Sequence, residues 1–198
     1  ISHIPDIGTD ALAGLGLSFP LIMFNTAISL LISSGSSALS TIKMGEGKND
    51  DASKLLNGSF TLLVITGVML MAFSYVFLSP MLTFFGGSTN TLPYAVEYMK
   101  IYLAGTIAGQ ISLGMNYFIN SQGYTRTGMI SVVCGAVANI ILDPILIFGL
   151  NMGIKGAAIA TVISQVISAV WVMAFLCGKT PVLRMSKAKL RPDAALTK

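Results

Sequence analysis

The chain has 198 residues, of which 54% are hydrophobic and only 10% are charged, and its net charge is +4. The charged residues are clustered between long uncharged runs, each long enough for a membrane-spanning helix of about 20 residues. With a mean hydropathy of +0.77, this is the composition of a membrane protein, and it gives no support to nucleic-acid binding.

We predict an all-α helical bundle of about five membrane-spanning helices. They occupy residues 12–42, 57–82, 93–121, 127–149 and 156–178. Lys and Arg collect in cytoplasmic connections. Ten of the twelve basic residues lie in the first connection, the third connection and the tail, against only Lys155 in the alternate segments. This asymmetry predicts an external N-terminus and a cytoplasmic tail. The remaining residue, Lys100, falls inside the third helix, where we expect it to pair with Glu97, three residues earlier.

Four of the helices carry small or polar residues at helical spacing. The first has Ser18, Asn25, Ser29, Ser33, Ser36 and Ser40, and the third has Tyr98, Tyr102, Gly105, Gly109, Ser112, Asn116 and Asn120. The fourth has Gly128, Ser131, Gly135, Asn139 and Asp143, and the fifth has Ala157, Thr161, Gln165 and Ser168. Close helix packing accounts for the Gly and Ser positions as well as a polar cavity does. For Asn116, and for Asn139 with Asp143, a polar cavity is the better explanation, because Ala would pack without an amide or carboxylate to satisfy.

Asp143 lies in a uniformly apolar part of the fourth helix. A charge at the centre of a membrane helix costs about 2.5 to 3.5 kcal/mol on insertion scales, and such acids usually bind or relay ions. Asp143 and Thr161 lie roughly 9 and 8 Å below the outer ends of their helices, at 1.5 Å per residue. Asn139 shares the face of Asp143, and Pro144 deprives the carbonyl of Ile140 of its usual donor. These hard oxygen ligands suit a small cation.

Three motifs occur in order along the chain. They are GSSALSTIKMGEGKNDDASK, NYFINSQGYTRTGM and NIILDPILIFGLNMGIKGAAIATVISQ. Together they resemble the second helix end and its cytoplasmic loop, the fourth helix end, and the fifth and sixth helices of the multidrug and toxic compound extrusion (MATE) transporters. The resemblance covers nearly the whole chain.

The resemblance implies a place in a twelve-helix, two-lobe transporter. Residues 1–178 would be helices two to six of the N-terminal lobe, and residues 179–198 would begin the cytoplasmic linker between lobes. The first helix and the C-terminal lobe of the same polypeptide would be the missing partners. The family's cation site falls on Asn139, Asp143 and Thr161, which would bind Na⁺ if sodium is the coupling ion. Its substrate contacts fall on Asn116 and, less closely, on Tyr98 and Gln165.

We therefore expect a non-enzymatic secondary antiporter in the cytoplasmic membrane that exports cationic or amphipathic compounds in exchange for Na⁺ or H⁺. We expect drug-like substrates and surrounding lipid as partners, and no cofactor beyond the coupling ion. A flippase for lipid-linked saccharides is an alternative, but it should place several basic residues within its helices, and only Lys100 is found there. A membrane-embedded prenyltransferase would need clustered acids, for which the inner loops offer Glu46, Asp50 and Asp51. A passive channel is a further alternative.

Overall fold

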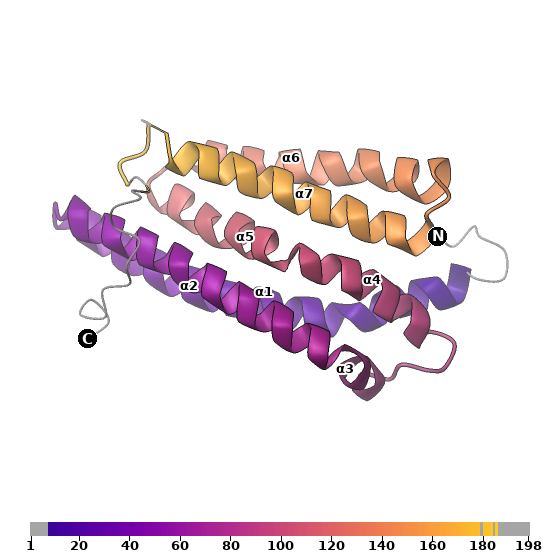
Figure 1. The fold of residues 1–198 in the computed structure, drawn as a ribbon. Helices are drawn as coiled ribbons and strands as arrows, with labels where there is room; N and C mark the ends of the chain where they lie inside the picture. Colours follow the sequence, from indigo (N-terminus) through magenta and orange to yellow (C-terminus); the bar gives the residue numbers. More distant parts are fainter. Residues whose placement is uncertain (1–7, 179, 184, 186–198) are drawn as a thin grey trace.

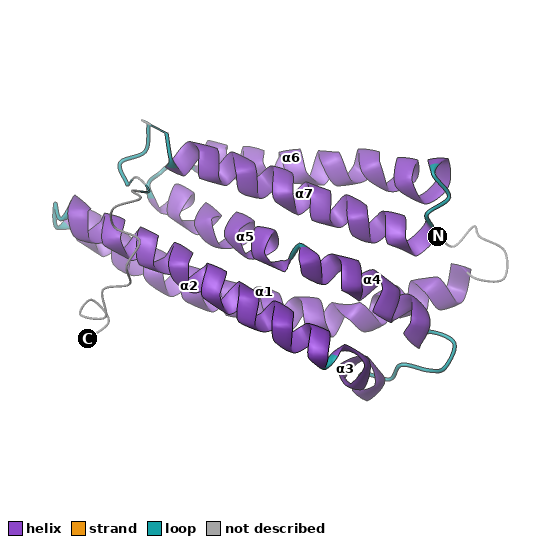
Figure 2. Cartoon of the chain, in the orientation of Figure 1, coloured by secondary structure: helices purple, strands orange, loops and turns teal. Residues whose placement is uncertain are grey.

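The computed structural model describes residues 8–178, 180–183 and 185, and this part of the chain is a bundle of helices without a strand (Figures 1 and 2). The helices are α1 (Gly8–Gly45), α2 (Asn49–Val76), α3 (Leu78–Phe84), α4 (Leu92–Ala104), α5 (Thr106–Ser121), α6 (Thr125–Pro144), the π-helix η1 (Ile145–Gly149) and α7 (Gly153–Leu176). The predicted all-α fold is confirmed.

Four uninterrupted segments are long and apolar enough to cross a membrane. They are Thr9–Gly45, Asn49–Val76, Thr125–Gly149 and Gly153–Leu176. The fifth predicted span is formed by α4 and α5, which follow one another along the bundle with a short break between them (Figure 2). Large apolar side chains such as Leu31, Met69 and Ile140 are 76%, 64% and 70% exposed. Such a surface suits contact with lipid rather than water.

The α4–α5 pair lies between the α1–α2 pair and the α6–α7 pair (Figure 1). The polar face of α1 is turned inward: Ser29 donates a hydrogen bond to the carbonyl of Gln110 in α5, and Ser40 donates to that of Ala52 in α2. Most of the predicted serine stripe is buried. At one position the buried residue is Ser37, whereas the predicted Ser36 is only half-buried. Most serines of α1 therefore serve helix packing.

The predicted continuous helix over 93–121 is wrong, because the helix is interrupted at Gly105. The Gly105 N–H donates to the carbonyl of Tyr102 rather than to the carbonyl four residues back. The side chain of Gln165 from α7 occupies the space beside this break: a Cβ added at Gly105 would lie 2.8 Å from its Oε1, and one at Gly109 would lie 3.2 Å from its Cδ. Likewise, the predicted helix over 57–82 is divided at Phe77 into α2 and α3.

The outer end of α4 is tied to α7 by an ion pair. Glu97 Oε1 lies 2.9 Å from Lys155 Nζ. The expected pair of Glu97 with Lys100 is therefore wrong, because the start of α7 brings a lysine to Glu97 from across the bundle.

The first described residues after α7 fold back on the bundle. The Leu183 N–H donates to Gln122 Oε1 (2.8 Å), and the hydroxyl of Tyr124 donates to the carbonyl of Thr180 (3.0 Å). Leu183 is fully buried in a cluster with Leu176 and other apolar residues of α1, α2, α5 and α7. These residues pack onto the bundle, while most of the predicted linker over 179–198 lies outside the described residues.

Candidate functional site

Asp143 stands one residue before the point where α6 changes into a π-helix. Pro144 ends α6, and because it has no N–H it cannot donate to the carbonyl of Ile140. The next five residues form η1, and π-turns within helices are frequent at functional sites. One turn before the acid, Asn139 Nδ2 donates a long hydrogen bond of 3.4 Å to Asp143 Oδ1.

Thr161 from α7 and Tyr98 from α4 complete the surroundings of this carboxylate. The Thr161 hydroxyl donates to the carbonyl of Ala157 in its own helix at 2.9 Å. The Tyr98 hydroxyl lies beside the Thr161 side chain, and it is close enough to Asp143 to interact with it electrostatically. The structure thus brings Asp143, Asn139, Thr161 and Tyr98 together from three helices.

The cluster combines one carboxylate with two hydroxyls and an amide. Because the Thr161 proton points at Ala157, the hydroxyl oxygen keeps a lone pair for another group. Asn139 presents its N–H to the carboxylate, so the amide oxygen that sequence reasoning assigned to the cation does not face Asp143 in this rotamer. The predicted binding of a cation by Asp143, Asn139 and Thr161 stays a prediction.

A groove of about 300 Å³ runs between α5, α6 and α7 beside this cluster. We call it the groove; it is lined by Gly109, Ser112, Leu113, Val132, Gly135, Ala136, Asn139, Thr161, Ser164, Gln165 and Ser168. Asn139 and Thr161 belong both to the cluster and to the groove wall, and Gln165 lies opposite the glycines of α5. No lining residue is charged, so the groove offers neutral hydrogen-bonding groups on an otherwise apolar wall.

Two of the predicted substrate contacts do not line this groove. Asn116 is 8% exposed and joins α5 to α6, since its Nδ2 donates to the Gly128 carbonyl (2.9 Å) and to Ser131 Oγ (2.6 Å). Its Oδ1 accepts from Asn120 Nδ2 at 2.8 Å. These bonds account for the amide through helix packing, and a substrate contact at Asn116 stays a prediction.

Tyr98 is also 8% exposed, and its ring stacks on Tyr102 with centroids 5.9 Å apart. Its position beside Thr161 places it in the carboxylate cluster rather than in the groove wall. A substrate contact there remains a prediction as well.

Sequence reasoning missed several buried polar residues of the interior, Ser164 and Gln110 among them. Ser164 lines the groove, and Gln110 lies in a smaller cavity on the other side of Gln165. Ser164 is three residues after Thr161 and four before Ser168, so the helical spacing of the stripe could have identified it. Gln110 was detectable as an uncharged amide in an apolar run, but nothing in the local sequence indicates which helix it faces.

Comparison with known proteins identifies the architecture. Residues 1–145 match the family model described as MatE. The chain is 30% identical over 169 residues to a protein of Shewanella oneidensis named FAD transporter, and the match covers 83% of this chain and 37% of that protein. It is 28% identical over 190 residues to the Bacillus subtilis protein named probable multidrug resistance protein YoeA, covering 93% of this chain and 41% of that protein.

Solved structures agree with this result. A crystal structure of MATE in the bent conformation superimposes with a TM-score of 0.93 at 25% identity, over 100% of this chain and 44% of that one. The chain therefore spans about two fifths of the length of the proteins that it matches.

Proposed function

Because this chain belongs to the MatE family, we propose that it is part of the N-terminal lobe of a secondary antiporter in the cytoplasmic membrane. The antiporter exports cationic or amphipathic compounds in exchange for Na⁺ or H⁺. The observation that carries the proposal is the placement of Asp143, a membrane-embedded carboxylate, next to Asn139, which lines the groove together with Thr161. An intramembrane acid beside a cavity is the arrangement expected of an ion pathway.

In this mechanism, Asp143 takes up the coupling cation and Thr161 supplies a second oxygen. Asn139 and Thr161 connect ion and substrate, since both line the groove and surround the carboxylate. A bound cation engages the Asp143 carboxylate, which is the hydrogen-bond acceptor of Asn139. Asn139 then changes its position in the groove wall when the ion binds. Exchange between the two sides of the membrane then follows from rocking of two lobes around a central site.

The test is Asp143→Asn in the full-length protein, reconstituted in proteoliposomes with imposed sodium or proton gradients. We expect the variant to insert and fold but to lose gradient-driven export of a fluorescent cationic dye, because the amide keeps the shape and cannot carry the charge. The control is the wild-type protein with the gradient collapsed by an ionophore, which shows how much dye leaves the vesicles without a driving force. Normal gradient-driven export by Asp143→Asn would contradict the proposal.

A second candidate substrate is FAD, which is what the Shewanella oneidensis relative is named for transporting. FAD is an anion because its diphosphate is ionised, and the groove lining offers it only neutral hydrogen-bonding groups. Export of FAD and of the cationic dye can be measured in the same vesicles, so the two substrate classes are compared directly.

The alternative functions receive less support. Lys100, on which a saccharide flippase would depend, lines a separate cavity with Glu97 and Lys155 rather than the groove. The loop acids expected of a prenyltransferase are paired with lysines: Lys48 and Lys43 hydrogen-bond Glu46 and lower the pKa of its carboxyl, and Asp51 pairs with Lys54. Within the described residues, no group of three His, Cys, Asp or Glu side chains could hold a metal ion.

A further inference from the structure

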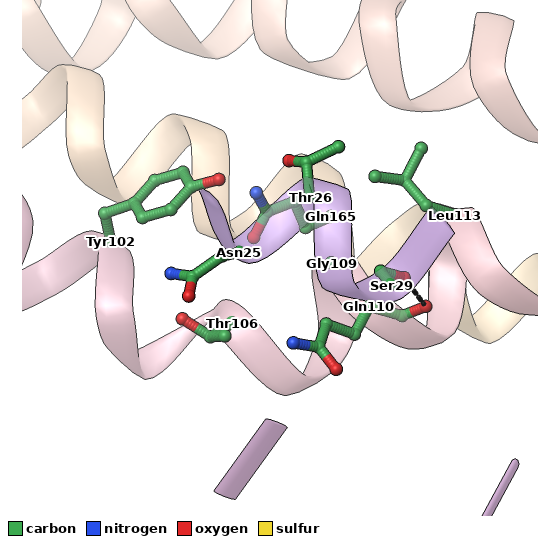
Figure 3. Close-up of a pocket in the computed structure, with 9 residues that line it drawn as sticks. All are labelled: Asn25, Thr26, Ser29, Tyr102, Thr106, Gly109, Gln110, Leu113 and Gln165. Carbon is green, nitrogen blue, oxygen red and sulfur yellow. Dashed lines mark hydrogen bonds between the residues drawn. The ribbon is translucent and has the colours of Figure 1, made fainter. Parts of the chain in front are cut away.

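A second, smaller cavity lies behind Gln165, at the break between α4 and α5 (Figure 3). Its volume is about 30 Å³, and it is lined by Asn25, Thr26, Ser29, Tyr102, Thr106, Gly109, Gln110, Leu113 and Gln165. These residues come from α1, α4, α5 and α7, and none is charged. We call it the joint cavity.

Several polar atoms at this cavity have no hydrogen-bond partner among the described residues. They are both side-chain polar atoms of Asn25, the Thr106 hydroxyl, Gln110 Nε2 and Gln165 Oε1. Asn25, Thr106 and Gln110 are only 5%, 4% and 3% exposed. Burying a polar group without a hydrogen bond is costly, and nearly all such groups in proteins are paired with protein or with ordered water.

The neighbouring hydroxyls do not donate to these atoms, because their protons are already engaged. Ser29 donates to the carbonyl of Gln110, and Thr26 donates to that of Ile22. The amide oxygen of Gln110 accepts a hydrogen bond from Thr66 at 3.4 Å, which leaves its Nε2 as the free end.

Gln165 is held in a similar way. Its side chain lies beside the Tyr102 hydroxyl, and its Oε1 has no hydrogen-bond partner among the described residues. Gly105 and Gly109 let the amide lie against the backbone of α4 and α5. The unpartnered oxygen is therefore fixed at the joint cavity.

The chemistry of the free atoms identifies what can bind there. Two amide nitrogens donate, two amide oxygens accept, and the Thr106 hydroxyl does either. A bound cation would face the two donors and would find no carboxylate among the lining residues. Water both donates and accepts, and a cavity of this size holds about two molecules, at 10 to 15 Å³ of accessible volume each.

We propose that the joint cavity is an internal hydration site, in which about two water molecules bridge Asn25 of α1, Thr106 and Gln110 of α5, and Gln165 of α7. Because Gln165 also lines the groove, this water fixes the Gln165 amide that forms one wall of the groove. The bridge also supplies partners at the break, where the helix itself is interrupted.

The first test is the thermal stability of Thr106→Val in the full-length protein, a substitution that keeps shape and removes the hydroxyl. If water bridges the cavity, the variant loses a water partner and its melting temperature falls. If the cavity is dry, the variant removes an unsatisfied polar group and the melting temperature stays or rises. Thr26→Val is the matched control, because its hydroxyl lines the same cavity but already bonds Ile22.

The second test requires no variant to fold: a high-resolution structure of the full-length protein, prepared once with sodium chloride and once with choline chloride. We expect solvent density within hydrogen-bonding distance of Asn25 and Thr106 in both preparations. Absence of density would overturn the proposal, and density present only with sodium would replace it with a cation site. Neither measurement depends on transport, so failure of the proposed antiport function would leave this result unaffected.

Discussion

Thr161 is the residue at which three helices meet. It lies on α7 beside Tyr98 of α4, and the Tyr98 hydroxyl in turn interacts electrostatically with Asp143 of α6. Its proton is committed to the Ala157 carbonyl, so its contribution to the cluster is an oxygen rather than a donor. A hydroxyl in this state is suited to bind a cation beside a carboxylate.

We predict that Thr161→Val in the full-length protein raises the sodium concentration for half-maximal export roughly ten-fold if sodium is the coupling ion, since one oxygen ligand worth about 1.4 kcal/mol is lost. If protons couple, the pH dependence of export shifts instead, because a hydroxyl beside Asp143 influences its titration. Ser164→Ala is the control: Ser164 also lines the groove and also bonds its own helix, at the Ala160 carbonyl. Identical sodium and pH responses in Thr161→Val and wild type would show that Thr161 and Asp143 do not share a site.

At the scale of helices, α7 approaches the backbone of the π-helix closely. A Cβ added at Gly156 would lie 2.7 Å from the backbone carbon of Leu146 and 2.8 Å from its oxygen. Backbone atoms cannot move aside as a flexible side chain can. The hairpin that holds Asp143 opposite Thr161 therefore depends on the absence of a side chain at Gly156.

We predict that Gly156→Ala lowers the melting temperature of the full-length protein and weakens export, because it pushes the outer ends of α6 and α7 apart. Gly149→Ala, in the same hairpin but with no atom within 4 Å of the new Cβ, should leave both unchanged. Equal stability and export in the two variants would mean that close packing of α7 against the π-helix at Gly156 is not required.

Much of this architecture could be predicted from the sequence, because hydrophobic runs and charge clusters are local properties. The helical segments that cross the bundle followed from them. Helix lengths placed Asp143 and Thr161 at one depth, and their sharing of a cation site stays a prediction. The break at Gly105 could not be predicted, since it depends on Gln165, sixty residues later in the chain, lying against α4 and α5. The alternative roles of Asn116 were likewise undecidable, because only the fold shows that Gly128 and Ser131 stand opposite its amide.

At the scale of the whole molecule, the distribution of Lys and Arg predicts how the bundle lies in the membrane. A reporter fused after Lys198 of the full-length protein should be cytoplasmic, and one inserted in the 85–92 loop should be external, because ten basic residues lie on one side against one on the other. Alkaline phosphatase and fluorescent-protein fusions at the two positions measure this. The reversed pattern would contradict the predicted topology, including the cytoplasmic location of the tail.

The π-helix after Pro144 has a mechanical consequence. A π-turn contains one residue more than an α-turn, and one residue of an α-helix corresponds to about 100° of rotation. Moving that extra residue to the other side of Asp143 would swing its carboxylate around the helix axis without shortening α6 or bending it. The chain thus has, next to its half-buried acid, an extra residue whose position decides in which of two directions the Asp143 side chain points.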